Sequence, residues 1–348
     1  MYNIQITPRL LHFKQPAGTS RGVYNTRKVW YIEISSMENP SIKGIGECAP
    51  LPNLSCDDVP QYEEVLQQAC SRVAREGNIP TESLRNYPSI LFGLETALRH
   101  YETGSLALWD TPFSRGEAGI PINGLIWMGN FEEMYRQIEA KMEAGYRCIK
   151  LKIGAIDFDA ELTLLKHIRS RFSVKDIELR VDANGAFSPA EAMHKLDALS
   201  KLDLHSIEQP IRAGQWEEMA RLTARTPLPI ALDEELIGHN IPEIKKELLS
   251  AIRPQYIILK PSLHGGICGS NEWIAEAEKQ NIGWWVTSAL ESNIGLNAIA
   301  QWCATLHNAL PQGLGTGQLF TDNIDLPLEI RKDCLWFCAE KPDRKSVV

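Results

Sequence analysis

The stretch CIKLKI (148–153) decides the fold, because aliphatic and charged residues alternate along it. Side chains on a strand point to opposite faces in turn, so Ile149 and Leu151 share one face while Lys150 and Lys152 share the other. The aliphatic face suits packing against helices. Both lysines therefore face the inner side of the sheet that this strand joins.

Short apolar segments of this kind recur along the chain, separated by amphipathic segments of about ten to fifteen residues with helical periodicity. Alternation of strand and helix predicts a parallel sheet, and eight repeats predict an eightfold βα barrel. The strand candidates are PINGLI (121–126), CIKLKI (148–153), IELRVD (177–182), HSIEQ (205–209), PIALD (229–233), YIILK (256–260), GWWVTS (283–288) and QGLG (312–315).

The first hundred or so residues follow a different pattern. VWYIEI (29–34) and GIGECAP (44–50) are typical of antiparallel strands. Helical patterns follow near 57–75 and 87–103. The amino-terminal part is therefore expected to form an α+β module.

The two patterns predict an α/β protein with a (β/α)8-type barrel and an amino-terminal α+β capping domain. We expect the capping domain over residues 1–118 and the barrel over 119–324. The stretch DLPLEIRKDCLWFC (325–338) has no place in the strand count. The segment 325–348 is therefore expected to pack back on the capping domain.

The composition is that of an ordinary globular protein, with 348 residues of which 44% are hydrophobic. A net charge of −8 disfavours nucleic acid or an anionic membrane as the main partner. The eight cysteines form no CxxC pair, so we expect them to be reduced and structural. The amino-terminal sequence MYNIQITPRL resembles no targeting segment, and no uncharged run reaches transmembrane length, which predicts a cytoplasmic protein.

Charged residues gather at the carboxyl ends of the predicted strands, where barrel enzymes place their catalytic groups. Three acids and a lysine follow one another at intervals of 25 to 27 residues, the length of one βα unit. Their side chains should recur at equal height around one rim. With the lysine pair of the second strand, the set is Lys150, Lys152, Asp182, Glu208, Asp233 and Lys260.

Each of these residues also has an ordinary structural explanation. Asp182 suits a turn or helix cap, Glu208 suits a surface loop, and Asp233 beside two glutamates suits a solvated acidic turn. The lysines could extend to solvent. Six charges at one depth on adjacent strands nevertheless bring like charges together, which favours a functional site.

Three carboxylates without histidine or cysteine favour a hard cation such as Mg²⁺, for which Mn²⁺ can substitute. Removal of a proton beside a carboxylate creates an enediolate, whose charge a metal ion offsets. A lysine can act as the base if a second lysine and the metal lower its pKa. The pattern therefore predicts proton abstraction from a small-molecule carboxylate.

The motifs KLK, VDAN, IEQP, LDE and LKPSL, in this order, resemble the muconate-lactonizing subgroup of the enolase superfamily. GECAPLP (46–52) is similar to the loop that the capping domain of this family places over the active site. The resemblance implies a lysine base and a metal-stabilised enediolate. It assigns the metal ligands Asp182, Glu208 and Asp233, the acid/base Lys152, the opposite-face lysine Lys260 and the supporting Lys150.

Within the subgroup, SALESNIGLNAIAQW (288–302) and QGLGTGQLF (312–320) resemble the o-succinylbenzoate synthases. These dehydrate 2-succinyl-6-hydroxy-2,4-cyclohexadiene-1-carboxylate to o-succinylbenzoate in menaquinone biosynthesis. Dipeptide epimerases and N-acylamino acid racemases share the scaffold and stay open as alternatives. Epimerases typically carry Asp-x-Asp after the eighth strand, whereas here isoleucine, Ile324, stands two places after Asp322, with Asp325 out of register. Muconate cycloisomerisation ranks lower, and an inactive binding barrel is disfavoured because every expected polar position is filled.

Substrate contacts are expected from two capping-domain loops, around residues 16–23 and 48–55, and from the ends of the seventh and eighth strands. Loops that close over a barrel mouth exclude water, which electrostatic catalysis needs. The first loop is rich in glycine and could equally be a simple turn. The residues expected to touch the substrate are Ser288, Gly315 and Arg21.

Overall fold

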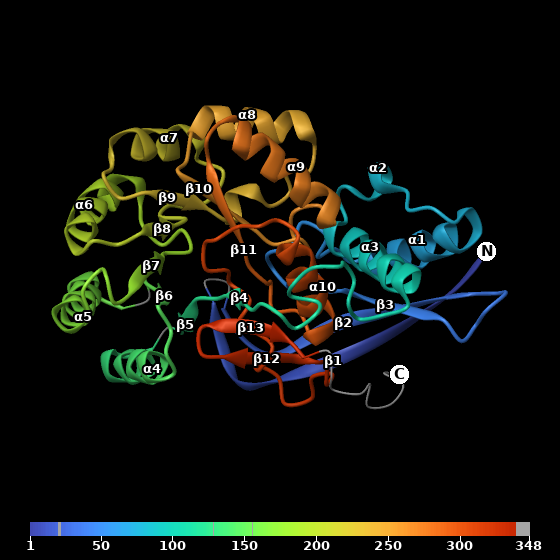
Figure 1. Cartoon of the computed structure of the whole chain (residues 1–348). Coiled ribbons are helices and arrows are strands. Elements are labelled where there is room, and N and C mark those ends of the chain that lie inside the picture. The colour runs from blue at the N-terminus through green and yellow to red at the C-terminus, as the bar shows by residue number, and fades with distance from the viewer. Residues whose placement is uncertain (20–21, 128, 155, 339–348) are drawn as a thin grey trace.

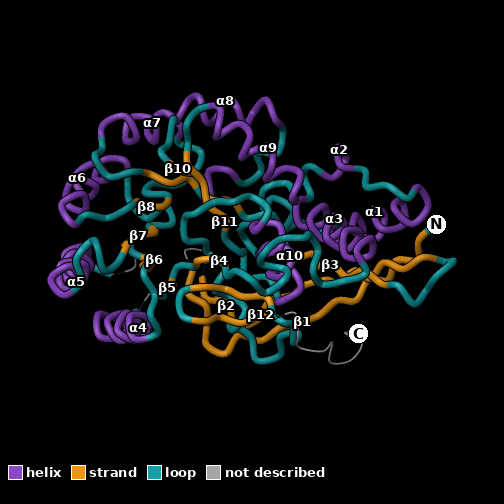
Figure 2. Tube along the Cα trace, in the orientation of Figure 1, coloured by secondary structure: helices purple, strands orange, loops and turns teal. Residues whose placement is uncertain are grey.

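The computed structural model describes residues 1–19, 22–127, 129–154 and 156–338. A ring of parallel strands with helices around it lies beside an antiparallel sheet with helices of its own (Figure 1). Figure 2 shows strands on the inside of the barrel and helices on its outer side. The predicted α/β fold, with a (β/α)8-type barrel and an α+β capping domain, is confirmed.

Seven parallel strands of the barrel are paired in chain order, so their carboxyl ends meet at one rim. Each lies within the segment predicted for it. They are β5 (Gly124–Ile126), β6 (Cys148–Lys152), β7 (Glu178–Asp182), β8 (Ser206–Glu208), β9 (Ile230–Leu232), β10 (Tyr256–Leu259) and β11 (Gly283–Val286).

The expected eighth strand, QGLG (312–315), is not a regular strand, and that prediction is wrong in detail. Single parallel bridges join Gln312 to Ile122 and Gly313 to Thr287. The backbone of Gly313 comes so close to Thr287 that a Cβ at this position would collide with the threonine side chain. The segment therefore closes the barrel through two bridges, and its glycines permit a close approach rather than a ladder.

The helices that follow the strands cover the barrel from outside. They are α4 (Phe131–Glu143), α5 (Phe158–Arg171), α6 (Pro189–Leu199), α7 (Trp216–Arg225), α8 (Pro242–Ile252), α9 (Gly266–Lys279) and α10 (Asn293–Ala304). Asn130 and Ser188 begin α4 and α6 with capping boxes. Ile149 and Leu151 are fully buried in the core between strands and helices, on the side predicted for them. No described helix is long and apolar enough to cross a membrane.

The capping domain consists of an antiparallel sheet and three helices. The strands and helices predicted for this part are present. The structure adds an unpredicted first strand, most of whose residues are exposed and whose register shifts between His12 and Ala17. The elements are β1 (Tyr2–Thr19), β2 (Gly22–Ser36), β3 (Lys43–Cys48), α1 (Tyr62–Glu76), α2 (Thr81–Leu84) and α3 (Pro88–Thr103).

The carboxyl-terminal segment divides its contacts between the two parts of the chain. Leu326 packs with Leu11 and Val29 of the capping sheet. The hairpin after it pairs instead with the segment that leads into the barrel, which offers an open strand edge. The start of the segment 325–348 thus contacts the capping domain and its hairpin contacts the segment before the barrel, while 339–348 lie outside the described residues. The paired strands are β12 (Leu328–Arg331), β13 (Cys334–Phe337) and β4 (Ile120–Pro121).

A buried glutamate joins the capping sheet to the barrel. Glu47, in β3, accepts hydrogen bonds from the backbone N–H of Ser292 at 2.8 Å, from its hydroxyl at 2.5 Å and from the N–H of Gly295 at 2.8 Å. These donors lie at the first turn of α10, where a helix leaves amides unpaired and favours negative charge. Burial nevertheless raises the pKa of Glu47 to about 7.

We predict that Glu47→Gln flattens the pH dependence of stability. The pKa of Glu47 rises from 4.5 to about 7 on folding, so the folded state binds more protons in this window and its stability falls as pH rises through it. Glutamine does not titrate. Either orientation of its amide turns an NH2 group toward a backbone N–H, so the variant should also be less stable at every pH.

Urea denaturation from pH 5 to pH 8 measures both effects. The free energy of unfolding of the wild-type protein should fall more steeply across this range than that of the variant. Parallel pH profiles would contradict the role given to Glu47.

Candidate active site

The strand ends bring the six predicted charged residues together. Neighbouring strands place Lys152 opposite Asp182, and Asp182 opposite Glu208, in the same register. Asp233 and Lys260 come directly after β9 and β10. The three acids are only 1 to 2% exposed, so Glu208 is no surface-loop acid and Asp233 lies in no solvated turn, while Asp182 does accept a turn hydrogen bond from the N–H of Asn184 at 3.0 Å.

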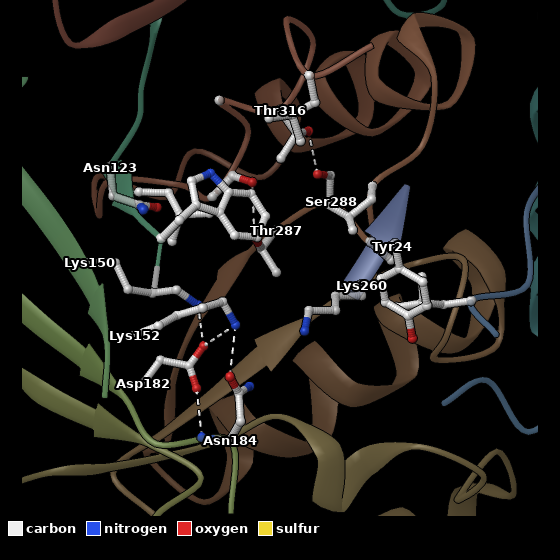
Figure 3. A pocket seen from close by; sticks show the side chains of 18 of the residues that line it. Tyr24, Asn123, Lys150, Lys152, Asp182, Asn184, Lys260, Thr287, Ser288 and Thr316 are labelled. Atoms are coloured by element: carbon white, nitrogen blue, oxygen red, sulfur yellow. Dashed lines mark hydrogen bonds and ion pairs between the residues drawn. The ribbon is translucent and has the colours of Figure 1, made fainter. Parts of the chain in front are cut away.

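Lysines pair with these acids from both sides of the barrel mouth. Lys150 Nζ lies 2.6 Å from Glu208 Oε2 and 3.1 Å from Asp182 Oδ2, and Lys152 Nζ lies 3.4 Å from the same Asp182 oxygen. Lys260 forms an ion pair with Asp233. Figure 3 shows Lys260 reaching into the pocket from the side opposite Lys150 and Lys152.

Charge is not evenly compensated in this cluster. Burial opposes ionisation of Asp182, but the surrounding lysines outweigh it and hold the pKa of Asp182 below its ordinary value. Burial and the charge of Asp182 raise the pKa of Glu208 well above its ordinary value, because Lys150 cannot neutralise both acids. Burial alone would lower the pKa of Lys150 and Lys260, yet the adjacent carboxylates raise it in both.

The remaining carboxylate oxygens suit a cation. Glu208 Oε1 and Asp233 Oδ1 are buried and receive no hydrogen bond from an amine, amide or hydroxyl of the described residues. Buried acids in this state are costly, and a divalent cation with oxygen ligands would compensate them.

The acids do not form a finished metal cage. Among the described residues, no three His, Cys, Asp or Glu side chains converge on one point. The ammonium groups of Lys150 and Lys260 contact the acids instead, at oxygens that a divalent cation would also use. A cation at these oxygens would displace the ammonium contacts and lower the pKa of the lysines.

Asn184 belongs to the site although it was not among the expected residues. Lys152 Nζ donates a hydrogen bond to Asn184 Oδ1 at 2.7 Å (Figure 3). Asn184 Nδ2 in turn donates to Glu234 Oε1 at 3.0 Å. The φ of Asn184 is 44°, a left-handed value that asparagine adopts more readily than most residues. The last letter of the motif VDAN was the available signal, because it places an amide side chain two residues after the metal-ligand candidate Asp182.

A cavity of about 260 Å³ lies at the barrel mouth. Its polar side includes Lys150, Lys152 and Lys260, and its apolar side is formed by Leu51, Leu54, Trp127, Leu290 and Leu319. Of the predicted substrate contacts, Ser288 and Gly315 line the cavity, and the hydroxyl groups of Ser288 and Thr316 lie 2.5 Å apart. Arg21 lies outside the described residues.

Two family models match the chain. Residues 133–339 match the model described as enolase C-terminal domain-like, and residues 20–101 match the MenC amino-terminal domain. The o-succinylbenzoate synthase of Desulfotalea psychrophila is 47% identical over 92% of this chain and 95% of its own length. The L-Ala-D/L-Glu epimerase of Bacillus subtilis is 28% identical over 51% of this chain and 48% of its own length.

Solved structures agree with these matches. The crystal structure of MenC from Desulfotalea psychrophila superposes with a TM-score of 0.85 at 41% identity, covering 96% of this chain and 99% of that one. The Bacillus subtilis epimerase shares the fold, with a TM-score of 0.80 at 20% identity over 96% of this chain and 95% of that one. The chain therefore belongs to the enolase superfamily and is similar to the o-succinylbenzoate synthases along almost its whole length.

Proposed function

We propose that this chain is an o-succinylbenzoate synthase. It is a lyase that dehydrates 2-succinyl-6-hydroxy-2,4-cyclohexadiene-1-carboxylate in menaquinone biosynthesis. The observation that carries the proposal is 47% identity to a synthase over 92% of the chain, with the family's lysine and acid pattern filled at every position.

The cavity suits such a substrate. Its lysines and acids suit a carboxylate and the hydroxyl group that leaves, while its leucines and Trp127 suit the ring and the methylene groups of the succinyl chain. Members of the superfamily use a divalent metal, here Mg²⁺ with Mn²⁺ as a substitute. Asp182, Glu208 and Asp233 would hold it. When bound, the cation offsets the charge that develops on the substrate carboxylate.

Lys152 would be the single acid/base. In a syn elimination the proton and the hydroxide leave from one face, so one group can take the first and protonate the second. The C–H bond beside the carboxylate breaks, its electrons form the ring double bond, and hydroxide leaves as water. Asp182 and Asn184 hold the Lys152 ammonium in position, at 3.4 Å and 2.7 Å.

Lys260 would act from the opposite face. It would stay cationic and stabilise the enediolate electrostatically, as a charge fixed in place before the reaction. Lys150, which lies beside Asp182 and Glu208, would support Lys152 as a neighbouring positive charge.

Racemisation or epimerisation is the second candidate. The lysines face the cavity from opposite sides, as a 1,1-proton transfer requires (Figure 3). The N-succinylamino acid racemase of Thermus thermophilus is 34% identical over 47% of this chain and 42% of its own length. Against dipeptides as substrates, Asp322 is bound to the backbone N–H of His12 at 2.8 Å and to its ring at 2.9 Å, and position 324 carries isoleucine.

The direct test is an assay with three substrate classes. We expect the purified protein with Mg²⁺ to dehydrate the cyclohexadiene carboxylate faster than it racemises N-succinylamino acids or epimerises dipeptides. Faster epimerisation or racemisation than dehydration would reject the synthase assignment in favour of the second candidate.

The metal site predicts that Asp182→Asn, Glu208→Gln and Asp233→Asn each weaken Mg²⁺ or Mn²⁺ binding and reduce dehydration. Each change removes one anionic ligand while keeping the side-chain shape. Calorimetric titration with Mn²⁺ measures binding without turnover. Wild-type metal affinity in all three variants would show that the ligands lie elsewhere.

The two lysines should respond differently to replacement. Lys152→Ala should abolish both dehydration and exchange of the substrate α-proton with deuterated water. Lys260→Ala should keep the base but lower kcat on the order of 10²-fold, as expected for loss of a preorganised charge. Exchange by both lysines with opposite stereochemistry would be incompatible with a one-base dehydration.

A further inference from the structure

A strained residue forms part of the cavity wall. Leu290 lies after β11, the seventh strand of the barrel. Its φ is 64°, in the left-handed region that residues with a side chain rarely adopt. It lines the cavity and packs with Leu51, Leu263 and Ala289 in an apolar cluster. Such a conformation persists only where the surroundings hold it, and it gathers at ligand-binding sites.

The capping domain supplies a group that holds it. Arg27, in β2, is 1% exposed, and its guanidinium donates to the carbonyl oxygens of Leu290 at 3.3 Å and Ala289 at 3.4 Å. The same guanidinium donates to the carbonyls of Pro50 at 2.5 Å and Ala49 at 2.6 Å. One arginine therefore joins the segment after β11 to the capping-domain loop that carries Leu51 and Leu54.

The neighbours of Leu290 are fixed as well. Glu291 accepts a hydrogen bond from the backbone N–H of Ala289 at 2.7 Å and another from the Ser262 hydroxyl. Glu47 accepts both the N–H and the hydroxyl of Ser292. The polar groups on both sides of Leu290 are thus bound to buried side chains, and the carboxylates of Glu291 and Glu47 offset the buried charge of Arg27.

We propose that Leu290 is a specificity-determining residue and that Arg27 is its positioning residue. Arg27 holds the Leu290 backbone in the left-handed conformation, which keeps the side chain against the apolar part of the substrate. That this apolar part is the substrate ring with its succinyl methylene groups rests on the proposed function. The role of Arg27 in the wall stands on the contacts alone.

The first experiment needs no substrate. Lysine at position 27 keeps the positive charge but lacks the branched guanidinium group that donates to four carbonyl oxygens. Hydrogen exchange of Arg27→Lys should show faster amide exchange in both 49–55 and 288–292. Unchanged protection in both segments would overturn the positioning role.

Arg169→Lys is the matched control. Arg169 also donates to backbone carbonyls of two segments, those of Ile177 at 2.9 Å, Leu202 at 2.9 Å and Asp203 at 2.8 Å, and it does not line the cavity. Its replacement should lower Tm without changing exchange in either wall segment. If amide exchange in the wall segments were faster in this variant too, the effect of Arg27→Lys would reflect a general loss of stability. That result would overturn the proposal.

The second experiment is steady-state kinetics with the cyclohexadiene carboxylate. Leu290→Ala and Arg27→Lys should each raise KM about 10-fold, the effect of a lost apolar contact, while kcat changes less. The double variant should fall short of the product of the two effects, because Arg27 acts through Leu290. Leu290→Gly, which relieves the backbone strain, should lower Tm less than Leu290→Ala does and still raise KM. Unchanged KM in the Leu290 variants, or fully multiplicative effects, would overturn the proposal.

Failure of the proposed function gives a different result. A wild-type protein that racemises N-succinylamino acids and does not dehydrate the ring substrate would reject the synthase assignment. The KM comparison then uses the N-succinylamino acid, and the exchange experiment decides the role of Arg27 in either case.

Discussion

The site depends on one constraint, which is that acids buried at the barrel mouth must be compensated by charges held at the same depth. Asp182, Glu208 and Asp233 are almost fully buried, and the lysines that neutralise them lie on neighbouring strands. Parallel pairing sets this depth, because it places Lys152 beside Asp182 and Asp182 beside Glu208. Isolated ionised acids of this kind would be very costly, so the charge pattern and the strand register require one another.

This coupling explains why the rim could be predicted from the sequence. Alternation along CIKLKI places Lys150 and Lys152 on one face, and regular spacing places Asp182, Glu208 and Asp233 at one height. Both are local or periodic properties. The eighth strand could not be predicted as it is, because the close approach of Gly313 to Thr287 depends on how the ring closes.

The residues that the sequence did not reveal act through long-range contacts. Arg27 and Leu290 are 263 positions apart, and Glu47 and Ser292 are 245 apart. Nothing near Arg27 in the sequence distinguishes a buried carbonyl-binding arginine from an exposed one on a strand. Asn184 is different, since its place in VDAN offered a local sign, but its partners Lys152 and Glu234 lie on other strand ends.

The division of the chain into two domains follows the same logic. The chain shares its fold with an epimerase at a TM-score of 0.80 and only 20% identity, so the fold alone does not select the reaction. The cavity wall consists of residues from the capping domain and from the segment after β11. It can change in sequence without altering the register of the barrel strands, because Arg27 and Glu47 hold it in place rather than the barrel sheet. The cost of this arrangement is a strained backbone at Leu290, which the buried contacts around it must hold in place.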